Sequence, residues 1–450
     1  MEMDLSWLNE QVDTIRTAFS YINRFKGHTF VIRVEGSLLE HSLFPLLIKD
    51  IVLLKKMGIR IALVPGARKR IDELLAAAHI VCPTVGEVRI TPPEAMPFVE
   101  MAAFDISNRI MTLLSEAECD AIIGNWVKAR RLGVLDGVDF QYSGETEKLK
   151  IDIIEKLLSA GSIPIFPNIG WSGTGKPYNI SSSELAFAVG SALHASKLFF
   201  ITDFGGIAAE DFEMPPGVEV TPENVISRLT SPQAKSFLDL NKRREKSLAY
   251  EIVSLAYRAC QAGIERVHVI DGREDGMLLK EIFSNRGFGT MIYADPHENI
   301  RTAAHADIPD ILKIMRPFIR ESILIPRRRE DLEAKIGDYA LYEVDGTLHG
   351  CGALHVFPEK TGEIAGIAVD KMYSNYGIGK KLVAFLLEKA AGLSLERVFL
   401  LTTHTADWFL ELGFTEASLE DIPLEKKAVY NKARNSLILV YDLNRRQQPG

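Results

Sequence analysis

The chain has 450 residues, of which 25% are charged and 47% apolar, with 33 glycines and 20 prolines. This composition is typical of folded globular proteins and excludes a collagen-like or largely disordered chain, and the length excludes a single small domain. The 52 Lys and Arg residues against 60 Asp and Glu give a net charge of −8, with no strongly basic stretch, so we expect no nucleic-acid partner.

The sequence also limits where the protein acts and what it binds. No apolar run reaches the roughly 18 to 20 residues that cross a bilayer, and the start of the chain is acidic where a signal peptide is basic. We therefore expect a cytoplasmic protein with no membrane partner. The four cysteines are far apart and form no CxxC pair, which predicts buried thiols and no metal site.

Residues 29–270 alternate short β-branched runs with segments of helical periodicity. The predicted strands are 29–34, 59–64, 121–123, 163–166, 197–202 and 266–270. This order is typical of an α/β fold with a mostly parallel sheet covered by helices on both faces. Because ligands bind beyond the carboxyl ends of such strands, the glycine-bearing loops 34–37 and 64–68 could hold an anion. Each loop is equally compatible with a tight turn.

In their order, segments 30–37, 64–72, 132–139, 179–184 and 200–203 resemble the amino acid kinase fold, specifically its N-acetylglutamate kinase branch. The resemblance runs from about residue 20 to 293. That family opens with Lys-x-Gly-Gly, but this chain has Arg33-Val34-Glu35-Gly36. A carboxylate about 4 Å from a phosphate costs on the order of 1 to 4 kcal/mol, and arginine does not reproduce the compact ammonium of lysine. We therefore expect a sensor domain that transfers no phosphate.

Arginine-sensitive members of this kinase branch bind arginine beside an added N-terminal helix, which also joins the subunits into a hexamer. Ile15, Phe19 and Ile22 form one apolar stripe that predicts such a helix here. The resemblance implies an allosteric L-arginine site made of Tyr21, Lys197, Glu281, Gly287 and Gly289. Without the resemblance, Tyr21 reads as helix packing, Lys197 and Glu281 as surface charges, and Gly287 as a helix C-cap.

The last third changes pattern after a polar linker at 294–298. A strand from residue 300, a helix at 307–319, a hairpin of 339–344 with 349–355, and a strand at 362–369 precede a helix at 379–391 and a strand at 398–402. A Gly-x-Gly turn, Gly377 to Gly379, opens the long helix, where free N–H groups suit a pyrophosphate.

Residues 300–443 resemble the GNAT acetyltransferase superfamily, although Ser374 stands where its loop signature has Gln or Arg. The resemblance implies that acetyl-CoA contacts the backbone of Ile367, Ala368, Val369, Gly377, Ile378, Gly379, Lys380 and Lys381. An amine attacks a thioester only when it is unprotonated, so a general base is needed. Glu363 is our candidate base and Thr402 our candidate donor to the leaving thiolate, though both residue types are also common at strand ends.

The whole arrangement resembles bacterial N-acetylglutamate synthases: an amino acid kinase-like sandwich (1–293), the linker, and a smaller GNAT α+β domain (299–450). The resemblance implies acetyl transfer from acetyl-CoA to L-glutamate, the first step of arginine biosynthesis, with feedback inhibition by L-arginine. Glutamate carboxylates need cations, and the resemblance assigns Lys426, Arg434, Arg327 and Arg328. Two alternatives stay open: a true N-acetylglutamate kinase and a non-catalytic arginine-binding protein.

Overall fold

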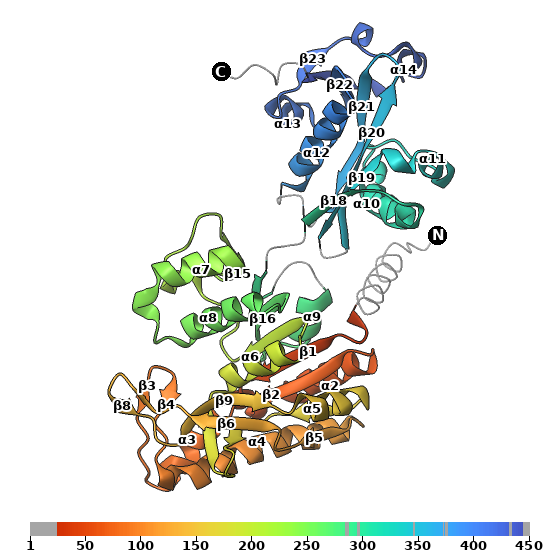
Figure 1. Ribbon diagram of the computed structural model, residues 1–450. Coiled ribbons are helices and arrows are strands. Elements are labelled where there is room, and N and C mark those ends of the chain that lie inside the picture. The colour runs from red at the N-terminus through yellow and green to blue at the C-terminus, as the bar shows by residue number, and fades with distance from the viewer. Residues whose placement is uncertain are drawn as a thin grey trace. The chain divides into compact units, whose positions relative to one another are not determined.

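The computed structural model describes residues 25–283, 288–294, 298–344, 347–371, 373, 377–431 and 434–443 (Figure 1). Tyr21 and the expected N-terminal helix lie outside these ranges, as do Gly287, Ser374 and residues 295–297 of the expected linker. The chain divides into two compact units, Met1–Asp295 and Pro296–Gly450.

The first unit is built on a mixed but mostly parallel sheet. The strands of the whole unit are β1 (Thr29–Val34), β2 (Arg60–Pro65), β3 (Thr84–Val85), β4 (Val88–Arg89), β5 (Ala121–Ile123), β6 (Val127–Arg131), β7 (Val134–Leu135), β8 (Val138–Asp139), β9 (Ser143–Leu149), β10 (Ile163–Ile165), β11 (Ile169–Trp171), β12 (Pro177–Ile180), β13 (Lys197–Thr202), β14 (Glu219–Val220), β15 (Ile226–Thr230), β16 (Arg266–Asp271) and β17 (Thr290–Tyr293). Its helices are α2 (Phe44–Lys56), α3 (Arg68–Ala77), α4 (Met96–Glu116), α5 (Ile151–Ser159), α6 (Ser182–Ala192), α7 (Ser231–Leu240), α8 (Leu248–Gln261) and α9 (Met277–Phe283).

Among the described residues the main sheet has nine strands in the order β14-β15-β17-β16-β13-β1-β2-β10-β5. Strand β1 lies at its centre, parallel to both β2 and β13. Every residue of β1 is buried, and its side chains alternate between two cores: Phe30 and Ile32 belong to one and Val31 to the other. A strand buried on both faces reads as the continuous apolar run seen in the sequence. The predicted parallel sheet with two covered faces is confirmed.

The second unit contains β18 (Glu298–Thr302), β19 (Tyr339–Val344), β20 (Thr347–Phe357), β21 (Thr361–Val369), β22 (Arg397–Thr402), β23 (Thr415–Ala417) and β24 (Leu437–Asp442), with α10 (Ile308–Arg320), α11 (Arg329–Ala334), α12 (Ile378–Gly392), α13 (Ala406–Glu411) and α14 (Leu424–Ala428). In its described part the sheet order is β18-β19-β20-β21-β22-β24-β23. One core packs α12 against Leu354, Ile364 and Leu400, and another packs α10 against Cys351 and Ala368 on the opposite face.

None of the helices described for either unit is long and apolar enough to cross a membrane.

Candidate active site

The sheet of the second unit opens between β21 and β22. These parallel strands pair only from Thr361 to Glu363, opposite Arg397 to Phe399. Beyond that point the structure shows no pairing of β21 with β22, and residues 364–369 of β21 have no strand neighbour on this side within the described part of the chain. The two strands therefore splay apart, which leaves backbone groups of β21 facing a gap.

The gap presents at least one well-placed backbone donor. The N–H of Asp370 donates to the His349 carbonyl at 2.8 Å, on the β20 side. Successive N–H groups of a strand point to opposite edges, so the Val369 N–H points toward the gap. This agrees with the expected contact between acetyl-CoA and the Val369 backbone, which stays a prediction.

A bulge in β21 shapes the floor of the same region. The pairing with β20 shifts register between Cys351 and Ala353, and Gly366 there adopts a φ of +64°. A Cβ at Gly366 would lie 2.9 Å from the Met315 methyl group and 3.5 Å from Nη2 of Arg327. Glycine is favoured in this left-handed conformation, and the Arg327 side chain lies against the bulge.

At the end of the gap, α12 begins with Gly377 in the left-handed conformation at φ +66°. Its first turn offers N–H groups that no helical carbonyl can satisfy. Gly379 packs against the Trp408 indole, which a Cβ would meet at 3.3 Å. Lys380 and Lys381 are both exposed, and the Lys381 Nζ lies 3.5 Å from the Tyr342 hydroxyl. The free backbone N–H groups and both lysines are therefore placed where they could meet a phosphate.

Glu363 and Lys426, predicted separately as base and substrate ligand, are in direct contact. The Lys426 Nζ lies 2.6 Å from Oε1 and 2.8 Å from Oε2 of Glu363. The Glu363 side chain is 7% exposed and that of Lys426 23%. The pair joins Glu363, the last residue of β21 that pairs with β22, to the short helix α14, at the point where the sheet opens.

The predicted arginines are placed differently from one another. Arg434 donates from Nη2 to the carbonyl oxygens of Ser322 and Ile323, at 3.1 and 2.5 Å, in the segment after α10. Arg327, in that same connection, holds its guanidinium 5.8 Å from the Tyr339 ring centre and has no acidic partner among the described residues. Arg328 is exposed at the start of α11. Arg327 and Arg434 thus border one segment, and Arg328 points to solvent.

Thr402 lies on the opposite face of the sheet from Glu363. Glu363 pairs with Phe399, so it projects away from the α12 core, whereas Thr402 follows Val398 and Leu400 on the face of that core. The Thr402 Oγ1 accepts the Thr405 N–H at 3.1 Å and lies 2.9 Å from the Thr405 hydroxyl. Thr402 therefore also shapes the turn that leads into α13.

The sequence reasoning missed His355, which lies directly across from Glu363 in β20. Its Nδ1 is 2.6 Å from Oδ2 of Asp338. Burial lowers the pKa of His355, although Asp338 works in the opposite direction. A titratable residue in the apolar run of β20 was the available signal.

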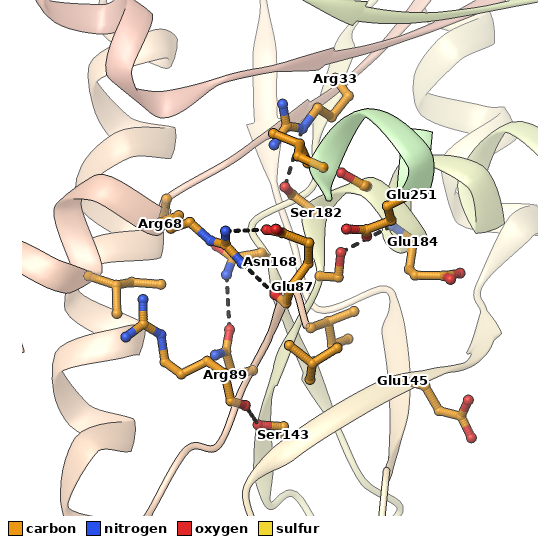
Figure 2. A pocket seen from close by; sticks show the side chains of 18 of the residues that line it. Arg33, Arg68, Glu87, Arg89, Ser143, Glu145, Asn168, Ser182, Glu184 and Glu251 are labelled. Carbon is orange, nitrogen blue, oxygen red and sulfur yellow. Dashed lines mark hydrogen bonds and ion pairs between the residues drawn. The ribbon is translucent and has the colours of Figure 1, made fainter. Parts of the chain in front are cut away.

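The first unit contains a cavity of about 850 Å³ at the carboxyl ends of its central strands, beside the starts of α3 and α6 (Figure 2). Arg33 and Glu35, the two departures from the kinase pattern, form an ion pair of 2.6 Å within it, with side chains 6% and 14% exposed. The Arg33 Nε also donates to Ser182 at 3.4 Å. The Glu35 carboxylate lies beside the glycine loop after β2, because a Cβ at Gly66 would be 3.2 Å from its Oε1.

Other charges that line this cavity are also paired internally. Arg68 binds Glu87, and Arg258 makes two hydrogen bonds of 2.6 and 3.1 Å to the Glu184 carboxylate. Glu251 lies nearby (Figure 2), and burial raises its pKa to about 7, with the nearby charges of Glu87 and Glu184 adding to this. A polyphosphate would have to displace these carboxylates or lie against them.

Three of the residues expected at the arginine site come together in the first unit. Lys197 is buried, and its Nζ lies 3.3 Å from Nε2 of His268. The His268 Nδ1 lies 2.8 Å from Glu281 Oε1, and Oε2 of Glu281 accepts the Phe288 N–H at 2.9 Å. Lys197 and Glu281 are therefore not surface charges. A Cβ at Gly289 would lie 2.0 Å from the Val269 carbonyl oxygen, so only glycine fits.

His268 links this group, and the sequence reasoning did not identify it. Burial, aided by the charge of Lys197, lowers its pKa to about 4. Hydrogen bonding to His268 helps to hold the Glu281 pKa below its usual value against the opposing effect of burial. The three side chains thus form one buried polar chain among the strands β13 and β16 and the helix α9.

In the described ranges, no group of three His, Cys, Asp or Glu side chains could hold a metal ion.

Comparison with known proteins identifies both units. The amino acid kinase family matches residues 28–271, and the acetyltransferase (GNAT) family matches residues 308–414. The amino-acid acetyltransferase of Actinobacillus pleuropneumoniae serotype 7 is 35% identical over 96% of this chain and 99% of its own. That of Escherichia coli strain K12 is also 35% identical, over 96% and 98%.

Solved structures agree with these matches. The N-acetylglutamate synthase of Neisseria gonorrhoeae, crystallised with coenzyme A and L-arginine, is 33% identical and superposes with a TM-score of 0.79, covering 96% of this chain and 99% of its own. The same enzyme with coenzyme A and N-acetyl-glutamate gives a TM-score of 0.59 at the same identity and coverage. With a kinase-like unit, a GNAT unit and this identity over almost its full length, the chain belongs to the amino-acid acetyltransferase family.

Proposed function

We propose that the protein transfers the acetyl group of acetyl-CoA to the α-amino group of L-glutamate, giving N-acetyl-L-glutamate and CoA. The observation that carries this proposal is the buried carboxylate of Glu363 at the mouth of the gap between β21 and β22. Cations of Lys426, Arg327 and Arg434 belong to the same unit, as a dicarboxylate substrate requires. Relatives named amino-acid acetyltransferases support the reaction.

The two substrates would reach the site from different directions. Acetyl-CoA would lie in the gap, with its pyrophosphate at the Gly377–Lys381 backbone and its carbonyl at the Val369 N–H. Such a donor is typically worth about 3 to 4 kcal/mol in the transition state. The amine would approach from the face of Glu363, which accepts its proton directly or through one water.

Bond making and breaking then balance without a further reactant. The amine nitrogen attacks the thioester carbonyl carbon, the tetrahedral intermediate collapses, and the carbon–sulfur bond breaks. The thiolate leaves toward the α12 face, where the Thr402 hydroxyl can donate a hydrogen bond to it; the proton taken by Glu363 returns to solvent, from which the thiolate can be protonated. Glu363 and Thr402 can serve these separate steps because they project from opposite faces.

Regulation by L-arginine is the second part of the proposal. Lys197, Glu281 and Gly289 would contribute to the arginine site, with Tyr21 and Gly287 completing it. The buried Lys197–His268–Glu281 chain supports a recognition role, because buried charges are rare unless they are paired. A ligand guanidinium would compete with His268 and the Phe288 N–H for the Glu281 oxygens. Inhibition is the expected sign.

We also propose a cytoplasmic homo-oligomer, with a hexamer expected, and a domain boundary at residues 294–298. Light scattering coupled to size-exclusion chromatography measures the subunit number directly. A monomer at micromolar concentration would contradict the proposed assembly without affecting the proposed reaction.

A free-thiol assay with acetyl-CoA tests the reaction, using L-glutamate as substrate and L-aspartate and N-acetyl-L-ornithine as controls. Glutamate-dependent CoA release suppressed by L-arginine is the expected result. Release indifferent to arginine would retain the transferase and reject the sensor role. Absence of release with glutamate would reject the proposed function.

A further inference from the structure

The starting point is the double contact of Lys426 with Glu363. The ammonium lies within 2.8 Å of both carboxylate oxygens, and the carboxylate side chain is 7% exposed. Among the described residues Lys426 is the only cation within ion-pair distance of Glu363. The proposed base is therefore neutralised by this lysine in the structure.

A substrate amine must reach one of the two Glu363 oxygens, and Lys426 already contacts both. The substrate amine, which enters as an ammonium, would meet a second positive charge already seated on the base. Catalysis then requires that Lys426 leave Glu363 or share its charge with another anion.

The structure gives Lys426 the freedom to do so. It lies on α14, a helix of five residues with no buried side chain, and its own side chain is 23% exposed. Lysine carries its charge on a flexible four-carbon stem with three rotatable donors. Its ammonium can thus turn between Glu363 and a second carboxylate bound nearby.

We propose that Lys426 is a specificity-determining residue that releases Glu363 only when a substrate carboxylate takes its ammonium. The idea rests on the proposed function, because it assigns that carboxylate to the bound glutamate. An amine without the carboxylate leaves the base neutralised. The protein then discriminates among amines by the rate of acetyl transfer in the bound complex as well as by binding affinity.

The test compares kcat at saturating acetyl-CoA for L-glutamate, L-glutamine and L-isoglutamine, which retains the side-chain carboxylate but carries an α-amide. Each of the two amides lacks one carboxylate of glutamate. In the unaltered protein, the amide without the carboxylate that Lys426 recognises should have a kcat at least about tenfold below that of glutamate, a difference of about 1.4 kcal/mol. In Lys426→Gln the ratio of the glutamate kcat to the kcat of this amide should fall toward one, because Glu363 is free whatever amine is bound. Lys426→Arg keeps a cation and should preserve most of the ratio.

Lys427→Gln is the matched control, since the neighbouring Lys427 pairs instead with the exposed Glu420 at 2.9 Å. It should behave as the unaltered protein. Two results would overturn the inference. One is a raised glutamate KM in Lys426→Gln with the kcat ratio unchanged, which makes the lysine a simple carboxylate ligand. The other is an equal fall of kcat for all three amines, which makes it a support for Glu363. Failure of the proposed function is distinct, because the unaltered protein would then release no CoA with glutamate.

Discussion

Replacement of Glu363 by glutamine removes the proposed base while keeping the shape of its side chain. General bases typically contribute about 10² to 10⁴ in rate, so kcat with glutamate should fall by about that factor. This corresponds to roughly 3 to 5 kcal/mol of transition-state stabilisation. The KM for acetyl-CoA should change little, since the predicted cofactor contacts use the backbone of other residues.

The same substitution should cost little stability. It leaves Lys426 without its anion, but that side chain is 23% exposed and can turn to solvent. The Glu363 end of the pair is buried, but the change leaves a neutral amide there and a lysine that reaches solvent, so we expect a loss of about 1 to 2 kcal/mol, between that of an exposed pair and that of a fully buried one. Thermal unfolding should therefore show a small shift of Tm, which separates a chemical defect from a folding defect.

The assay is steady-state release of CoA thiol, with acetyl-CoA and glutamate varied independently. Glu420→Gln is the matched control, because Glu420 also pairs with a lysine of α14 but is 87% exposed. Its kcat should match that of the unaltered protein. A fall of less than about tenfold in Glu363→Gln would refute the assignment of Glu363 as the base.

Further expectations concern substrate binding, phosphate transfer and pH. Arg434→Ala should raise the glutamate KM at least about tenfold and leave that of acetyl-CoA nearly unchanged, and equal effects on both would reject its role as a carboxylate ligand. Because Glu35 and Arg33 neutralise each other in the kinase-like cavity, ATP and N-acetyl-L-glutamate should give no phosphorylated product in a radiolabel assay, and any product would contradict the sensor interpretation. The His268 pKa of about 4 lies below the ordinary 6.5, so the folded state takes up this proton less readily than the unfolded one. Its contribution to stability is complete above pH 6.5 and lost as the pH falls toward 4, by up to about 1.4 kcal/mol per pH unit. Unfolding curves at several pH values should show this slope, and its persistence in His268→Gln would assign it to other groups.

The family was accessible from the sequence because local patterns report local structure. The buried run of β1, the alternation behind the parallel sheet, and the Gly-x-Gly turn before α12 each depend on residues close together in the chain. The same holds for Arg33 and Glu35, which stand two residues apart on one strand and its loop. Their departure from the kinase pattern could be read directly.

Contacts between distant segments were decided only by the tertiary structure. Glu363 and Lys426 are 63 positions apart, and a role for each could be predicted without any sign that they touch. His268 joins Lys197 to Glu281 across 71 and 13 positions, and His355 meets Glu363 through strand register. Burial and pairing set the charge of such groups, and both depend on which strands and helices meet. Sequence patterns therefore identified the chemistry available to this protein, and packing determined which charges neutralise one another.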